Sequence, residues 1–196
     1  MADLNDDHLI EIRLQTEQLF KGHFLDVRRA TVRLPSGDTA TREYIEHPGA
    51  VMVIPLLDDG RVILERQYRT PIGRVLWEFP AGKIDPGEST FTCAMRELAE
   101  ETGYRAAEWA RAGIMHNACA YSTEGIEVWF ARGLTHGNQA LDHGEHLEIV
   151  PLDERELDAL AARGELTDAK TLVGVLWLHR WRAGAWPLQW QASIPN

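Results

Sequence analysis

Hydrophobic and polar residues alternate along two neighbouring segments near the start of the chain. Ala30, Val32 and Leu34 fall on one side of "FLDVRRATVRL", and the turn signal "PSGD" separates this segment from "TATREYIEH". Because side chains of a strand point alternately to its two faces, the pattern predicts a β-hairpin. We expect residues 1–46 to form a small N-terminal hairpin appendage.

The middle of the chain is more apolar and ends in helical patterns. "AVMVIPLL", "DDG" and "RVILERQYR" predict a second hairpin, central in a sheet that is covered on both sides, and "GIEVWFARGL" and "LEIVPL" predict further strands. One helix begins in "DEREL" and ends at Gly164, and another covers "AKTLVGVLWLHRWRAG" after a cap at Asp168. This order predicts an α/β domain over residues 47–183, with a mixed sheet between helices, followed by an irregular tail over 184–196.

A short helix is predicted between Ser89, which can cap its start, and Gly103, which ends it. Glu97, Glu100 and Glu101 gather on one side near its C-terminal end, where neighbouring like charges and the helix dipole both cost stability. A solvated acidic face is the ordinary interpretation of such a charge run. The turn-rich loop before the helix and the third acid favour a bound hard cation instead. The apolar stripe of this helix consists of Phe91, Ala94, Met95, Leu98 and Thr102.

Composition excludes several classes of protein. The chain has 196 residues, 44% of them hydrophobic and 26% charged, and no apolar run reaches the roughly 18 residues of a membrane span. A formal net charge of −10 argues against nucleic-acid binding. Only two cysteines occur, Cys93 and Cys119, and the start "MADLNDDHLIEIRLQ" does not have the pattern of a secretory signal. We therefore expect a cytoplasmic protein of one main domain.

The segment from Gly82 to Tyr104 resembles the complete signature of the Nudix hydrolases. Gly82 is followed after five residues by Glu88, and after seven more by "RELAEETGY". The resemblance implies an α/β/α sandwich and hydrolysis of a nucleoside diphosphate linked to another group, with Mg²⁺ or Mn²⁺ as cofactor. Metals between carboxylates and phosphate oxygens acidify a bound water and stabilise the charge of the transition state.

Site roles follow from this resemblance, position by position. Glu97 and Glu101 are the principal metal ligands that it implies, and Glu100 is an additional ligand or the catalytic base. Ala81, before the signature glycine, offers its backbone carbonyl to a metal. Arg96 orients the glutamates, and Glu88 is either a ligand or a brace for the loop that begins at Gly82.

The flanking segments are similar to the ADP-ribose pyrophosphatase branch of the family. They are "ERQYRTPIGRVLWEFPAGKID", "REYIEHPGAVMVIPL" and "LTDAKTLVGVLWLH". The similarity implies cleavage of ADP-ribose to AMP and ribose 5-phosphate, with Arg69 and Arg42 as contacts to phosphate or adenine; surface salt bridges are the alternative for both arginines. Cys119, expected to be a packed thiol, stands where this branch usually has proline. Hydrolysis of another sugar nucleotide such as GDP-mannose therefore stays open. A binding module that keeps the fold as a ligand sensor without turnover is a separate alternative.

A loop acid and an assembly complete the expectations. In ADP-ribose hydrolases, a loop corresponding to "LDHGEHLEIV" supplies a glutamate that approaches the metals as ligand or base, and Glu145 fits this place best. A shift of register would give the role to Asp142 or Glu148. The apolar residues of the N-terminal hairpin cannot be buried by a lone hairpin. Relatives use such strands to form a dimer, so we expect a homodimer whose partner completes the substrate pocket.

Overall fold

The computed structural model describes residues 5–141 and 143–193, and these residues form two compact units. One unit contains the residues up to 48 together with 118–124, and the other contains 49–117 and the residues from 125 onward. Among the described residues, none of the helices has the length and apolar character that a membrane crossing requires.

The N-terminal unit is built on an antiparallel sheet with the strand order β1-β2-β3. The predicted hairpin is confirmed as β2 (Asp26–Arg33) and β3 (Thr39–Ile45). A third strand, β1 (Ile12–Lys21), follows the short 3-10 helix η1 (Asp7–Leu9) and pairs with β2. Two register shifts interrupt this pairing, so the apolar residues of β1 do not keep a regular period of two, and the sequence pattern did not predict the strand.

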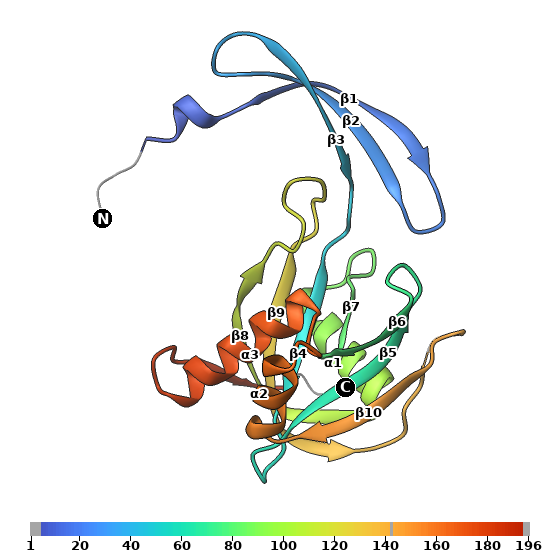
Figure 1. Ribbon diagram of the computed structural model, residues 1–196, viewed down its shortest axis with the longest axis vertical. Coiled ribbons are helices and arrows are strands. Elements are labelled where there is room, and N and C mark those ends of the chain that lie inside the picture. Colours follow the sequence, from blue (N-terminus) through green and yellow to red (C-terminus); the bar gives the residue numbers. More distant parts are fainter. Residues whose placement is uncertain (1–4, 142, 194–196) are drawn as a thin grey trace. The chain divides into compact units, whose positions relative to one another are not determined.

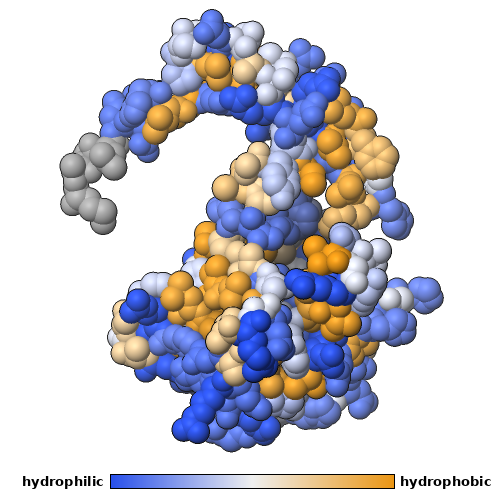
Figure 2. All heavy atoms as spheres, in the orientation of Figure 1, coloured by the Kyte–Doolittle hydropathy of each residue, from blue (hydrophilic) through white to orange (hydrophobic). Residues whose placement is uncertain are grey.

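Much of the apolar surface of this unit is exposed. All ten residues of β1 are exposed, and Figure 2 shows hydrophobic residues along the strands of the unit. The loop 118–124 is paired with the end of β3, since the Ile45 amide donates to the Tyr121 carbonyl at 2.8 Å. Cys119 in this loop is an exposed free thiol, so the expectation of a packed thiol was wrong. Among the described residues of the unit, the exposed large apolar ones are Leu9, Ile10, Ile12, Leu14, Leu19, Phe20, Phe24, Leu25 and Tyr121.

Two sheets form the frame of the second unit. The larger has the strand order β11-β8-β9-β4-β7 and is mixed, because β4 and β9 run parallel while its other neighbours are antiparallel. The smaller is antiparallel, with the order β10-β5-β6. The strands are β4 (Ala50–Pro55), β5 (Val62–Arg69), β6 (Arg74–Glu78), β7 (Ala81–Lys83), β8 (Tyr104–Met115), β9 (Ile126–His136), β10 (Leu147–Leu152) and β11 (Trp190–Ala192).

Helices cover both faces of the larger sheet (Figure 1). α1 (Thr90–Thr102) packs on one face together with Val51 and Val53, whereas α2 (Glu154–Ala162) and α3 (Ala169–Arg182) pack on the face of Met52 and Ile54. All of β4 is buried, because its alternating side chains enter a core on each face. The predicted α/β/α arrangement with a mixed sheet is confirmed.

Two predicted details of the second unit are wrong. A turn does join β4 to β5, but the segments share only the isolated bridge between Leu56 and Val62, and the two strands belong to different sheets. The apolar residues of both strands predict burial within a sheet. They do not show with which strand each one pairs. The tail also contains β11, which pairs with β8 and thereby extends the larger sheet.

Candidate active site

Helix α1 carries the glutamates of the signature toward the interior. Its start is capped by Ser89, whose Oγ accepts from the Thr92 amide at 3.1 Å, and Gly103 ends it in the left-handed conformation, at φ 74°. Both boundaries are those that the sequence predicts. Glu97 and Glu101 lie four residues apart on one face, and their exposed fractions are only 9% and 4%. Two carboxylates are thus held out of water side by side.

The short strand β7 approaches these two glutamates very closely. The Ala81 amide donates to Oε2 of Glu101 at 2.9 Å. A Cβ atom added at Gly82 would lie 1.9 Å from Cδ and from Oε1 of Glu97. Only glycine therefore leaves room for the Glu97 carboxylate against the backbone of β7. The structure brings Ala81 and Gly82 together with the helix glutamates; the contact of Ala81 is through its amide, and the metal-binding role of its carbonyl stays a prediction.

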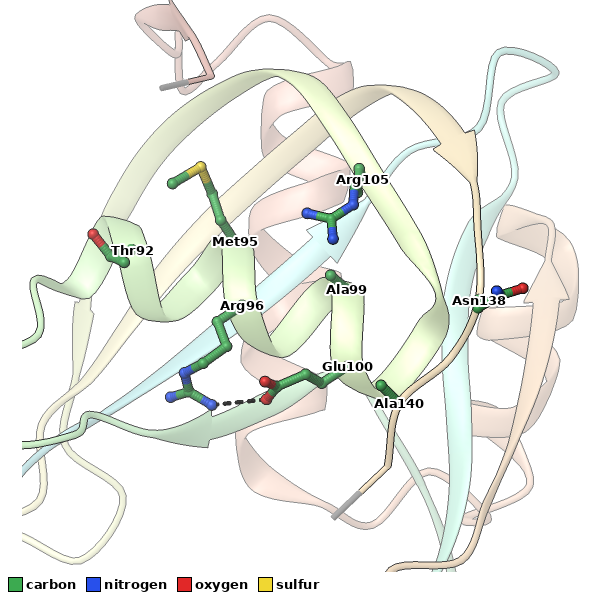
Figure 3. A pocket seen from close by; sticks show the side chains of 8 residues that line it. All are labelled: Thr92, Met95, Arg96, Ala99, Glu100, Arg105, Asn138 and Ala140. Atoms are coloured by element: carbon green, nitrogen blue, oxygen red, sulfur yellow. Dashed lines mark hydrogen bonds and ion pairs between the residues drawn. The ribbon is translucent and has the colours of Figure 1, made fainter. Parts of the chain in front are cut away.

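Arg96 lies among the acids of the helix and of the preceding loop. Its guanidinium donates to Glu88 at 2.9 and 3.0 Å, to Glu97 at 2.8 Å and to Glu100 at 3.0 Å, and Figure 3 shows it turned toward Glu100. Hydrogen bonds from Arg96 hold the pKa of Glu88 below its usual value. Glu88 also accepts from the Asp85 amide at 3.2 Å, which ties it to the loop. This geometry agrees with an orienting Arg96 and a bracing Glu88, roles that stay predictions.

A further buried carboxylate enters the site from β5. Glu65 is 0% exposed, and neither of its carboxylate oxygens accepts a hydrogen bond within the described part of the chain. Burial raises its pKa to about 8, although the positive charge of Lys170 works in the opposite direction. Burial also raises the pKa of Glu97 to about 7, against the influence of Arg96. The pKa of Glu101 is raised well above its usual value by burial and by the charges of Glu65 and Glu97.

Glu145 is the loop acid that reaches this cluster. Its Oε1 accepts from Nε2 of Gln67 at 3.3 Å, and its negative charge contributes to the raised pKa values of Glu97 and Glu101. Glu148 instead lies on β10 and is paired with Arg66 at 2.6 Å. The third candidate for the role, Asp142, lies outside the described residues. Of the two described candidates, Glu145 is the one that influences the helix glutamates.

Arg69, a predicted substrate contact, is held by a buried acid that the sequence analysis missed. Nε and Nη2 of Arg69 donate to the two carboxylate oxygens of Glu78 at 2.7 and 2.8 Å. Lys170 donates to the same carboxylate and, at 3.0 Å, to Asp168. Burial works to raise the pKa of Glu78, but the hydrogen bonds from Arg69 and the charge of Lys170 lower it overall. The Arg69 side chain is still 39% exposed, so part of it remains accessible.

Arg42, the other predicted substrate contact, belongs to the N-terminal unit. It lies on β3, where its guanidinium is paired with Glu11. The site residues Glu65, Glu78 and Lys170 were not predicted. Glu65 and Glu78 adjoin apolar strand residues, in "VILE" and "LWEF", and Lys170 stands in the first turn of a helix, in "DAKTLV"; no periodic pattern links the three. For the two glutamates, a charge beside apolar strand residues was the available signal, because charged residues are almost never fully buried unless paired.

The donor set of this cluster fits a hard divalent cation. Mg²⁺ and Mn²⁺ take carboxylate, carbonyl and water oxygens, and Glu65 has two buried oxygens that accept no hydrogen bond from the residues that the structure describes. In the present arrangement, the described residues include no group of three or more His, Cys, Asp or Glu side chains that could hold an ion. Glu97 is turned to Arg96 and Glu101 to the Ala81 amide. The ligand set of Ala81, Glu97, Glu100 and Glu101 therefore stays a prediction.

Comparisons with known proteins agree with this geometry. Residues 46–172 match the model of the NUDIX domain, and residues 11–45 match that of the nucleoside diphosphate sugar hydrolase N-terminal domain. An ADP-ribose pyrophosphatase of Bacillus subtilis is 34% identical, over 87% of this chain and 94% of the relative. A methanol dehydrogenase activator of Bacillus methanolicus is 33% identical, over 86% of this chain and 92% of the relative. A crystal structure of an ADP compounds hydrolase has a TM-score of 0.78 at 24% identity, over 89% of this chain and 95% of that one, and shares the fold.

Proposed function

The chain belongs to the Nudix hydrolase family, and from this premise we propose that it hydrolyses the pyrophosphate bond of a nucleoside diphosphate sugar, with ADP-ribose as the substrate and AMP and ribose 5-phosphate as the products. The observation that carries the proposal is the burial of Glu65, Glu97 and Glu101, with β7 in close contact with Glu97 and Glu101. Relatives named for ADP-ribose and the N-terminal match to sugar nucleotide hydrolases support the choice of substrate.

The proposed chemistry assigns a role to each part of the site. Mg²⁺ or Mn²⁺, when bound, supplies positive charge to the phosphate oxygens and acidifies water. Glu97, Glu101 and the Ala81 carbonyl hold it, with Glu100 as an additional ligand. Arg96 keeps the carboxylates oriented.

Glu145 takes the proton of the water whose oxygen attacks phosphorus, while the bond from that phosphorus to the bridging oxygen breaks. Glu100 is the alternative base. Positioned acid–base groups of this kind typically contribute about 10²–10⁴-fold to the rate.

Substrate contacts and assembly belong to the same proposal. Arg69 contacts a phosphate or the adenine with the part of its side chain that Glu78 leaves exposed. Arg42, on β3, is the second proposed contact to phosphate or adenine. We also propose a homodimer formed through residues 1–46, and a cytoplasmic location, which the exposed free thiol of Cys119 supports.

The substrate alternative rests on one departure from the ADP-ribose pattern. Cys119 replaces the usual proline, and this replacement favours a test of other sugar nucleotides such as GDP-mannose. A sensor without turnover is disfavoured, because all the signature glutamates are present.

A substrate panel separates these functions. Purified protein is incubated with ADP-ribose, GDP-mannose and other sugar nucleotides in Mg²⁺, and the phosphorylated products are identified. We expect AMP and ribose 5-phosphate from ADP-ribose, and no product in excess EDTA. A higher kcat/KM for GDP-mannose would reassign the substrate, and no product from any compound would favour the sensor.

A further inference from the structure

The segment after β9 is hydrogen-bonded to the C-terminal end of α1. The Gly137 amide donates to the Gly103 carbonyl at 2.7 Å, and the Ala140 amide donates to the Glu100 carbonyl at 3.0 Å. Between these two contacts, the side-chain amide of Gln139 donates to the Glu101 carbonyl. Helix ends leave carbonyls that require partners. Here those partners come from a distant segment, and two of the carbonyls belong to signature glutamates.

Packing contributes little to the position of this segment. A cavity of about 360 Å³ lies between α1 and the segment, bordered by Arg96, Glu100 and Ala140 (Figure 3). A second cavity of about 820 Å³ borders Gly137 and Gln139. The segment "GNQA" has no large apolar side chain, and its residues are exposed. Its position therefore depends on the hydrogen bonds to α1.

Gly103 gives this contact the space that it needs. Its φ of 74° suits glycine, and a Cβ at this position would lie 3.0 Å from the Gly137 oxygen and 3.1 Å from the Gln139 nitrogen. The last glycine of the signature thus ends helix α1 and also leaves room for the segment "GNQA".

The same stretch of chain leads directly to Glu145. Gln139 precedes Glu145 by six residues, and Glu145 is itself tied to β5 by the hydrogen bond from Gln67. Residues 137–140 are thus attached to α1, and Glu145 is attached to β5. Loss of the hydrogen bond from Gln139 to α1 removes one of the contacts that fix this stretch of chain relative to the helix glutamates.

We propose that Gln139 is a positioning residue for the hydrolytic reaction: its side-chain amide holds the loop on the carbonyl of Glu101 and thereby places Glu145 beside the signature glutamates. This inference rests on the proposed function, in which Glu145 takes the proton of the attacking water. Gln139 itself contacts neither substrate nor metal.

A double-mutant cycle tests this role. Gln139→Met keeps the length of the side chain and removes the donor, so it should lower kcat for ADP-ribose by about 10-fold or more, because misplacement by about 1 Å is costly. KM and the affinity for Mn²⁺ should stay within about twofold of the wild-type values, since the substrate and metal contacts are kept. In the Glu145→Gln background, the same substitution should change kcat by less than about twofold.

The control is Asn138→Ala, since Asn138 is the exposed neighbour of Gln139 and its side chain is directed away from α1 (Figure 3). It should keep wild-type kcat. Equal losses from Gln139→Met in both backgrounds would show that Gln139 supports the helix rather than Glu145, and would overturn the proposal. Wild-type kcat in Gln139→Met would overturn it as well.

Amide hydrogen exchange separates failure of this inference from failure of the proposed function. If the wild-type protein hydrolyses no sugar nucleotide, the proposed function fails, but exchange can still be measured. Gln139→Met should accelerate exchange at Gly137, at Ala140 and in the peptide that carries Glu145. Unchanged exchange at these amides would overturn the positioning role.

Discussion

At the scale of single residues, burial and cationic partners together set the pKa of each glutamate. Burial raises the pKa of Glu65 to about 8 and that of Glu97 to about 7, whereas hydrogen bonds from Arg96 lower the pKa of Glu88. Acids whose pKa is raised by burial and by like charges are typical of functional sites. A cation among them offsets the cost of burying their charges.

Gly82 gives a direct test of this crowding. In Gly82→Ala, the new Cβ must displace the Glu97 carboxylate, which is the flexible end of a side chain, so we expect the protein to fold. Displacement of a metal ligand by about 1 Å should lower kcat by roughly 10²-fold and weaken binding of Mn²⁺. Steady-state kinetics and a Mn²⁺ titration measure the two effects.

Gly113→Ala is the matched control, because its new Cβ would meet only the Trp177 ring, at 3.1 Å. Its kcat should stay within about twofold of the wild-type value, as expected for a change away from the reacting groups. Wild-type kcat and Mn²⁺ affinity in Gly82→Ala would contradict the proposed role of Glu97.

The sequence predicts site residues where they share a local pattern. Glu97, Glu100 and Glu101 are recognisable because they gather on one side of a single helix, and Gly82 because it is the first glycine of the Nudix signature. Glu65 and Glu78 come from different strands, and only the pairing of β5 with β6 makes them neighbours. A single sequence contains no pattern that shows which residues of distant strands become neighbours.

At the scale of secondary structure, elements defined by neighbouring residues were predicted, whereas pairings between distant strands were missed. α1 was predicted to its ends because its caps and apolar stripe lie within the helix itself. The pairing of β4 with β9 and of β5 with β10 depends on segments far along the chain. The hydrophobic pattern of these strands indicates burial but not the neighbour.

Asp26 joins two strands of the N-terminal sheet and predicts a pH dependence. Its carboxylate accepts from Arg28 at 2.7 and 2.8 Å, and from Gln18 and Lys21 of β1 at 3.0 Å each. These hydrogen bonds, that of Arg28 foremost, lower the pKa of Asp26 below its usual value of 3.8. The stability that the group contributes is therefore present above pH 3.8 and is lost as the pH falls through the lowered pKa.

Hydrogen exchange of β1 and β2 measures this contribution. Asp26→Asn should exchange faster than the wild type at neutral pH, because the charge-assisted hydrogen bonds are lost. The difference should begin to shrink as the pH falls below 3.8, where the unfolded chain takes up a proton, and should vanish at the lowered pKa, where the folded wild-type carboxyl also becomes neutral. A difference that stays constant over this range would contradict the assignment.

At the scale of the whole molecule, the exposed apolar residues of the N-terminal unit predict a homodimer. A three-stranded sheet that leaves Leu14, Leu19 and Phe20 exposed buries little apolar surface by itself, and a second copy can cover them. Light scattering should therefore give twice the 22.1 kDa mass of one chain. Leu14→Lys should shift the protein toward the monomer, whereas Ile72→Lys, at an exposed apolar residue of the other unit, should not. A fully active wild-type monomer at micromolar concentration would contradict the proposed assembly.

The central claim is that the glutamates of α1 hold a metal for hydrolysis, and Glu101→Gln tests it most directly. Glutamine keeps an oxygen that can accept from the Ala81 amide and removes a buried charge, so the unfolding temperature should not fall. The measurement is the rate of AMP release from ADP-ribose in Mg²⁺. We predict that the wild type is active and loses its activity in excess EDTA, and that kcat of Glu101→Gln is lower by about 10²-fold or more because one metal ligand is lost. Wild-type turnover by Glu101→Gln, or turnover by the wild type in excess EDTA, would contradict the account.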